Sequence, residues 1–257
     1  MPPNPFATET AARIYAAGRP DYSDRVTGII RKLLGKEVRF RRAVDVGSGT
    51  GISTMALAPL AEEVIGVEAS PAMVEHARSA PNVIYRIGAA EDMPLEDGSC
   101  DLIGVGSAVH WFDQERFLTE AERVATSDAW LVVHDHWFTA HMRDVEDFSG
   151  WFRETYLNRY PPSRDRWWRP PDDLGSWRHT AMERYQHQVR LDPTGLAKYL
   201  LTQSNLQTVM ERGDESEDVL RAWLIAETTD FFPDGREVDF TFGGFVACHS
   251  RRPHRRS

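Results

Sequence analysis

The stretch AVDVGSGTGISTMA, residues 43–56, places three glycines at alternate positions directly after a short apolar run that contains an aspartate. Gly47, Gly49 and Gly51 leave a backbone without side chains, and glycine permits both the backbone angles of a sharp turn and the close approach of a ligand. The apolar run is typical of a buried strand, and a helix is expected to follow. The stretch therefore predicts a strand, a glycine-rich turn and a helix, with Asp45 beside the turn.

The spacing of the glycines separates two kinds of cofactor site. A dinucleotide-binding enzyme has the pattern G-x-G-x-x-G, which requires glycine at position 52, but this residue is Ile52. The observed pattern is D-x-G-x-G-x-G. A second apolar run ends in Glu68, about twenty residues further on, where a carboxylate could hold the hydroxyls of a ribose. A nicotinamide-dependent oxidoreductase is therefore the less favoured alternative.

Short apolar segments alternate with helical segments around this turn. The expected strands lie at residues 42–46, 63–68, 82–87, 100–106 and 129–136. This alternation predicts a three-layer α/β fold, in which helices cover both faces of a mostly parallel sheet. The pair Ser70–Pro71 predicts one helix start, and Asp113 predicts another, because both positions carry a side chain that can cap a helix.

Residues 138–236 interrupt the alternation. Trp, Tyr, Arg and Pro crowd the first part of this segment, and helical patterns follow at residues 193–210 and 215–232. We expect a helical lid inserted into one domain, whose core comprises residues 24–137 and 237–250.

The last expected strand has Val238, Phe240 and Phe242 at alternate positions, and it is expected to be antiparallel to the others. Gly243 and Gly244 predict either a bulge or a tight hairpin, and the pattern does not distinguish the two.

Composition limits the class of protein. The chain has 257 residues, of which 41% are hydrophobic and 27% charged, as expected for one large core. Its net charge of -9 argues against a nucleic-acid partner, although basic residues cluster at 31–42 and 249–257. No apolar run of roughly twenty residues and no secretory signal pattern occur, so we expect a cytoplasmic protein without a membrane partner. The two cysteines predict reduced thiols.

Several motifs, taken in order, resemble the class I S-adenosylmethionine-dependent methyltransferases, particularly their small-molecule branch. They are IYAAGRPDYS (14–23), VDVGSGTG (44–51), VIGVEASPAMVEHAR (64–78), GAAEDMPLEDGSCDLI (88–103) and SAVHWFD (107–113). The resemblance implies a Rossmann-like methyltransferase fold and S-adenosylmethionine as cofactor. It also implies a small-molecule acceptor methylated on oxygen, nitrogen or carbon, such as a natural-product intermediate or a small organic acid. A protein that uses the same fold for another reaction or for binding alone is the alternative.

The resemblance also assigns roles to residues. The glycines would contact the methionine and ribose portions, Asp45 would organise the turn and the ammonium group, and Glu68 would hold the ribose. Residues 90–92 would border the adenine, and Ala89 stands where the family often has an acidic residue that contacts the adenine amino group. The complete set expected to contact the cofactor is Tyr15, Arg19, Asp45, Gly47, Ser48, Gly49, Gly51, Glu68, Ala69, Ala90, Glu91, Asp92 and Ser107.

His110 follows the fourth expected strand, at the edge of the sheet where α/β proteins bind ligands. An imidazole can take the acceptor's proton at physiological pH, so His110 is the predicted catalytic base. Alternatively, His110 only lines the pocket with Trp111. His134 and His136 are expected pocket residues and the second choice as bases.

The segment that contains these two histidines raises a metal site as a further possibility. Asp135 and His141 lie beside His134 and His136 in the sequence. No second carboxylate cluster completes a site for a hard cation, so no metal is predicted.

Overall fold

The computed structural model describes residues 5–35, 37–162 and 173–251. Residues 163–172 of the expected lid and residues 252–257 of the basic tail therefore lie outside the described residues. The described residues divide into two compact units. The glycine-turn unit comprises residues 21–35, 37–136, 173–185 and 244–251, and the aromatic unit comprises residues 5–20, 137–162 and 186–243.

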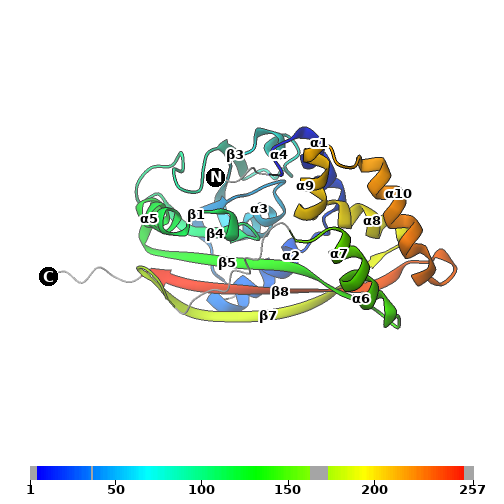
Figure 1. The fold of residues 1–257 in the computed structure, drawn as a ribbon. Helices are drawn as coiled ribbons and strands as arrows, with labels where there is room; N and C mark the ends of the chain where they lie inside the picture. Colours follow the sequence, from blue (N-terminus) through cyan, green and yellow to red (C-terminus); the bar gives the residue numbers. More distant parts are fainter. Residues whose placement is uncertain (1–4, 36, 163–172, 252–257) are drawn as a thin grey trace. The chain divides into compact units, whose positions relative to one another are not determined.

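Within the described ranges the strands form one eight-stranded sheet, in the order β3-β2-β1-β4-β5-β8-β7-β6 (Figure 1). The strands are β1 (Phe40–Val46), β2 (Ala61–Glu68), β3 (Val83–Ile87), β4 (Cys100–Gly106), β5 (Ala125–Met142), β6 (Asp173–Leu174), β7 (Trp177–Leu191) and β8 (Val238–Arg251). The pairs β1 with β2, β1 with β4, β2 with β3 and β4 with β5 are parallel. Their carboxyl ends therefore meet at one edge of the sheet.

Strand β8 runs antiparallel to β5. The guanidinium of Arg251, at the end of β8, donates to the carbonyl oxygen of Ala125, at the start of β5. Conversely, Thr139 near the end of β5 donates from Oγ1 to the carbonyl oxygen of Thr241 near the start of β8, at 2.7 Å. The predicted α/β fold with a mostly parallel sheet and an antiparallel last strand is confirmed.

Polar side chains cap the starts of two helices in the glycine-turn unit. The Ser70 hydroxyl accepts from the Met73 amide, and the Asp113 carboxylate accepts from the Arg116 amide, as predicted for two helix starts. The elements of this unit are α2 (Ser23–Leu34), α3 (Ile52–Leu57), η1 (Ala58–Leu60), α4 (Pro71–Glu75), η2 (Val109–Trp111) and α5 (Gln114–Val124).

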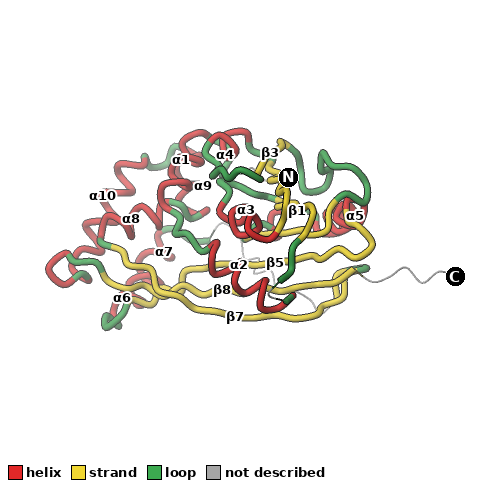
Figure 2. Tube along the Cα trace, turned by 180° about the vertical axis from the view of Figure 1, so that it is seen from behind, coloured by secondary structure: helices red, strands yellow, loops and turns green. Residues whose placement is uncertain are grey.

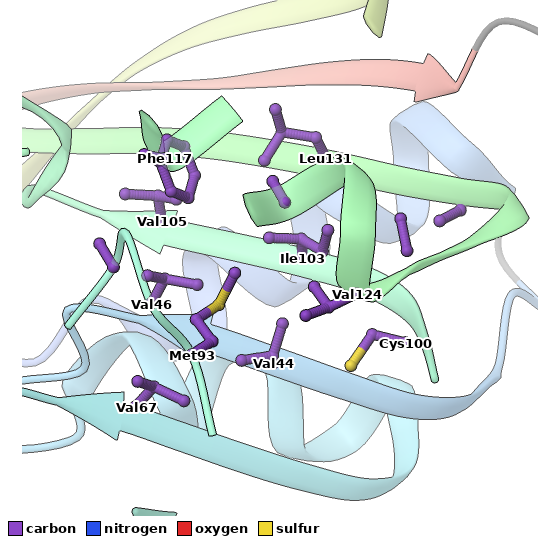
Figure 3. Close-up of a cluster of buried hydrophobic side chains, with 14 of the residues drawn as sticks. Val44, Val46, Val67, Met93, Cys100, Ile103, Val105, Phe117, Val124 and Leu131 are labelled. Atoms are coloured by element: carbon purple, nitrogen blue, oxygen red, sulfur yellow. The ribbon is translucent and has the colours of Figure 1, made fainter. Parts of the chain in front are cut away.

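Apolar side chains cover both faces of the sheet in this unit. Figure 3 shows one cluster, in which Phe117 and Val124 of α5 face residues of β1, β2, β4 and β5. On the other face, α2 and α3 lie side by side (Figure 2), and Val26, Ile30 and Leu57 pack into a second cluster. Helices on both faces give the three layers that the sequence predicted.

The aromatic unit holds the remaining helices. They are α1 (Glu9–Gly18), α6 (Asp147–Trp151), the π-helical η3 (Phe152–Tyr156), α7 (Leu157–Arg159), α8 (Pro193–Leu201), α9 (Ser204–Arg212), α10 (Glu217–Thr228), η4 (Thr229–Phe231) and η5 (Pro233–Gly235). Phe148, Tyr156, Tyr199, Phe240 and Phe242 are fully or almost fully buried in its core. Among the described residues, no helix has both the length and the apolar composition needed to span a bilayer.

The segment 138–236, expected to form a helical lid, also contains strand β7. This strand alternates between exposed residues and residues that are at least partly buried. The partly buried side includes His179, Glu183 and His187, whose polar side chains conceal the apolar alternation by which strands are recognised.

Gly243 and Gly244 do not form the tight hairpin that was one of the two expectations, because β8 continues through both. A Cβ atom at Gly243 would lie 2.8 Å from the Trp137 ring, and one at Gly244 would lie 2.3 Å from Tyr185. The two glycines therefore make room for aromatic rings on neighbouring strands.

Candidate active site

The glycine-rich turn joins β1 to α3, and two of its glycines have different tasks. Gly49 and Gly51 have φ values of 53° and 84°, in the left-handed region that favours glycine. A Cβ atom at Gly51 would lie 2.3 Å from the Tyr85 hydroxyl, so the protein itself fills this side of the turn. Apart from its two chain neighbours, a Cβ atom at Gly49 would meet no atom of the described residues within 4 Å. Gly49 is therefore the point at which a ligand can reach the backbone.

Hydrogen bonds hold the turn against the end of β2. The amides of Gly47 and Ser48 both donate to the Val67 carbonyl oxygen, at 2.8 and 3.1 Å. Glu68 Oε2 accepts from the Gly49 amide and Oε1 from the Ser70 amide, each at 2.9 Å. Each carboxylate oxygen has a further lone pair, so Glu68 can also accept from a ligand hydroxyl. In the structure, the predicted glycine turn therefore lies beside Glu68, the residue predicted to bind the ribose.

Asp45 is completely buried beneath the turn. Its Oδ2 accepts from the hydroxyls of Ser53 and Thr54, each at 2.6 Å. Its Oδ1 and the Ser48 hydroxyl make no hydrogen bond among the described atoms. Burial raises the pKa of Asp45 to about 6, and the nearby Glu68 carboxylate also raises it. A buried carboxylate with one unpaired oxygen is suited to a cationic or hydrogen-bond-donating ligand group.

Asp45→Asn is expected to change how stability depends on pH. The pKa of Asp45 is raised above its ordinary value of 3.8, so its stabilising contribution is present below that value and is lost as pH rises through about 6. The unfolding free energy of the wild type should fall relative to the variant between pH 4 and 7, by up to about 3 kcal/mol. Urea unfolding of both cofactor-free proteins across this range measures the difference. If the unfolding free energies of the two proteins change with pH in parallel, the raised pKa of Asp45 is contradicted.

The segment after β3 supplies the residues expected near the adenine. Ala90 is buried, whereas Asp92 is exposed. Glu91 Oε1 accepts from the Asp113 amide at 2.7 Å, so this carboxylate supports the start of α5. Ala69, another residue of the set expected to contact the cofactor, directly follows Glu68 at the end of β2.

The predicted base lies in the turn that follows β4. His110 and Trp111 belong to η2, both are partly buried, and their ring centroids are 5.3 Å apart. A Cβ atom at Gly47 would lie 2.8 Å from Ala108 Cβ and 3.0 Å from Phe112 Cζ. The segment that carries His110 therefore packs directly against the glycine turn.

His134 and His136 are two positions apart in β5, so their side chains lie on the same side of the strand. The Tyr22 ring stacks on His136 with centroids 4.3 Å apart and meets His134 edge-on at 6.0 Å. Burial lowers the pKa of His134 to about 4, so its ring is neutral at pH 7 and is a weak proton acceptor. The lowered pKa argues against base catalysis by His134, and its role in lining a pocket stays a prediction.

The possible metal ligands are divided between the two compact units. His141 is exposed and belongs to the aromatic unit, whereas Asp135 belongs to the glycine-turn unit. Over the ranges that the structure describes, no group of three or more His, Cys, Asp or Glu side chains could hold a metal ion.

Tyr15 and Arg19 belong to the aromatic unit, not to the glycine-turn unit. The Arg19 guanidinium lies over the Tyr15 ring, 4.9 Å from its centroid, and 5.5 Å from the centroid of Tyr199. These contacts orient the guanidinium, and the role of both residues toward the cofactor stays a prediction.

Sequence reasoning missed the residues that support the turn. Ser53 and Thr54 hold Asp45, and the Tyr85 hydroxyl donates to the Arg78 carbonyl oxygen at 2.6 Å beside Gly51. The two hydroxyl residues at the start of the helix were a usable signal. Tyr85 gave none, because its approach to the turn depends on the pairing of β2 with β3.

A strand, a glycine turn and an acid at the end of the next strand define a cofactor-binding α/β domain. Comparison with known proteins shows what this domain is similar to. Residues 44–133 match the family model described as a methyltransferase domain. The matched segment contains the glycine turn, Glu68 and His110, so this part of the chain is similar to methyltransferase domains.

Individual relatives agree with this family. A Dictyostelium discoideum protein named as a methyltransferase is 36% identical over 122 residues, which cover 48% of this chain and 46% of that protein. An uncharacterized methyltransferase of Mycobacterium tuberculosis is 34% identical over 146 residues, covering 56% and 55%. The chain spans about half the length of the curated relatives it matches.

Solved structures share the fold. One from Anaeromyxobacter dehalogenans, named as a type II methyltransferase, has a TM-score of 0.70 at 23% identity and covers 92% of this chain and 99% of its own. A Haemonchus contortus phosphoethanolamine N-methyltransferase, solved with phosphomonomethylethanolamine and S-adenosylhomocysteine, has a TM-score of 0.52 at 14% identity, covering 97% and 58%.

Proposed function

We propose that this protein transfers a methyl group from S-adenosylmethionine to an oxygen, nitrogen or carbon atom of a small molecule, with S-adenosylhomocysteine as the product. The observation that carries the proposal is the open side of Gly49 next to the Glu68 carboxylate, within the matched methyltransferase domain. The unpaired Asp45 Oδ1 and Ser48 Oγ beneath the same turn fit the polar groups of this cofactor.

When bound, S-adenosylmethionine supplies a methyl group that its sulfonium already activates for in-line displacement. The protein's task is to align the reactants, exclude water and remove a proton. Glu68 binds the ribose hydroxyls, Asp45 faces the ammonium group, and Gly49 permits the close approach. His110 takes the acceptor's proton at an imidazole nitrogen, while Trp111, His134 and His136 line the acceptor pocket.

Residues 138–236 are proposed to bind the acceptor, with Tyr15 and Arg19 at the carboxylate end of the cofactor. A natural-product intermediate or a small organic acid in the cytoplasm is the proposed acceptor. The net charge of -9 favours such a small molecule over a nucleic acid.

A mass-spectrometric screen tests this proposal. The full chain is incubated with S-adenosylmethionine and a panel of hydroxy acids, carboxylic acids, amines and phenols. We expect at least one compound to gain the mass of one methylene group, together with release of S-adenosylhomocysteine. If the protein binds the cofactor but methylates nothing in the panel, and no S-adenosylhomocysteine appears, the transfer reaction is contradicted and a binding role is favoured.

Glu68→Ala is expected to weaken S-adenosylhomocysteine binding by about 1.5–3 kcal/mol, or roughly 10- to 150-fold, because charge-assisted hydrogen bonds are lost. Isothermal titration calorimetry measures the affinity. Glu62→Ala, on an exposed residue of the same strand, is the matched control and should bind like the wild type. Equal affinities for Glu68→Ala and Glu62→Ala would remove Glu68 from the site.

A further inference from the structure

The backbone of Ser107 is strained at the start of the segment that carries His110. Its φ is 51°, in the left-handed region that L side chains rarely adopt. Ser107 directly follows the last residue of β4. Such a conformation persists only where surrounding contacts hold it.

The contacts that hold Ser107 come from β5. Ser107 Oγ donates to Asp135 Oδ1 at 2.7 Å, and the Ser107 amide donates to the His134 carbonyl oxygen at 2.9 Å. Asp135 Oδ1 also accepts from the His136 amide at 2.8 Å. One carboxylate oxygen therefore fixes the Ser107 side chain to the backbone of β5.

The direction of the chain after Ser107 depends on this arrangement. The next residues leave the sheet and pack on the glycine turn through Ala108 and Phe112. The Trp111 amide donates to the Ala108 carbonyl oxygen at 2.9 Å and closes the short turn that contains His110. If Ser107 relaxed to an ordinary strand conformation, the chain would leave β4 in another direction and His110 would move with it.

We propose that Asp135 is a positioning residue: by accepting from the Ser107 hydroxyl, it holds Ser107 in the left-handed conformation and so places His110 beside the glycine turn. The inference rests on the proposed methyl transfer and assigns Asp135 no contact with the reacting atoms. It also changes the expected role of Ser107, from a cofactor ligand to the other half of this hydrogen bond.

Four variants separate this role from its alternatives. Asp135→Ala removes the acceptor, whereas Asp135→Asn keeps an oxygen that can accept from Ser107. Ser107→Ala loses the hydroxyl and keeps the strain, whereas Ser107→Gly loses the hydroxyl and relieves the strain. We expect Asp135→Ala and Ser107→Ala to lower kcat at least about tenfold, with S-adenosylhomocysteine affinity within about threefold of wild type. Asp135→Asn and Ser107→Gly should recover most of the lost rate.

Two results of the rate and binding measurements would overturn the proposal. If Asp135→Asn loses as much rate as Asp135→Ala, the charge itself is required and Asp135 acts as a base. If Ser107→Ala and Ser107→Gly both weaken S-adenosylhomocysteine binding while Asp135→Ala does not, Ser107 is a cofactor ligand.

Amide hydrogen exchange of Trp111 and Phe112 provides a readout that needs no activity. Exchange at both amides should accelerate in Asp135→Ala and Ser107→Ala and stay near the wild-type rate in Asp135→Asn. Unchanged exchange in all variants would contradict the positioning role. If the wild type transfers no methyl group to any acceptor, the proposed function fails, while the exchange measurement still decides whether Asp135 holds this turn.

Discussion

Gly49→Leu is expected to reduce S-adenosylmethionine and S-adenosylhomocysteine binding by more than about 100-fold, or about 2.7 kcal/mol, while the protein still folds. No atom of the described residues beyond the two chain neighbours lies within 4 Å of the position that a Cβ would take, so the Cβ of the leucine is accommodated without a clash. The leucine side chain fills the space through which the cofactor reaches the turn. The left-handed backbone adds a loss of stability of about 1–2 kcal/mol.

Gly98→Leu is the matched control for that backbone strain. Gly98 has a φ of 59°, and the atom nearest to a Cβ there is the Ala125 carbonyl oxygen at 4.0 Å. It precedes β4, at the edge of the sheet opposite to the glycine turn. Titration calorimetry and thermal unfolding on both variants separate strain from occlusion. If Gly98→Leu and Gly49→Leu lose equal stability and both bind normally, the cofactor does not approach Gly49.

The contrast between Gly49 and Gly51 shows what the sequence could predict. The D-x-G-x-G-x-G pattern, the caps at Ser70 and Asp113 and the apolar runs of β1 to β4 depend on neighbouring residues, and these elements formed as expected. The pattern could not show that Gly51 accommodates Tyr85 while Gly49 faces open space. That difference arises when β3 pairs with β2, which is a long-range event.

The turn after β4 and strand β7 were not predicted, because the residue types at these positions are not typical of the structures that they form. A left-handed backbone conformation is usually predicted from a glycine, but position 107 is serine. The conformation of the turn that carries His110 could therefore not be predicted. Strand β7 was missed because its partly buried side is polar in several places. In both cases contacts with strands that are distant in the sequence stabilise a local backbone conformation that the residue types alone disfavour.

His110→Ala is expected to lower the methylation rate by at least about tenfold and by as much as about 10⁴-fold, with cofactor affinity intact, once an acceptor is known. A hydroxyl, carboxylic acid or amine acceptor must lose a proton during the reaction. His110 is partly buried on the segment that packs against Gly47, whereas burial lowers the pKa of His134 to about 4. His134 is thus a poor proton acceptor at neutral pH, and His110 is the imidazole whose segment lies against the glycine turn.

His110→Gln separates base catalysis from pocket lining. Glutamine can still hydrogen-bond the acceptor but cannot take a proton at neutral pH, so a base role predicts that it is as slow as His110→Ala. Raising the pH should then partly restore both variants if the acceptor ionises unaided, because the proton no longer needs an acceptor on the protein. His141→Ala, which removes an exposed histidine, controls for the loss of an imidazole as such. Near wild-type turnover in His110→Gln together with a slow His110→Ala would assign His110 to acceptor binding. Wild-type turnover in both variants across the pH range would remove it from the reaction.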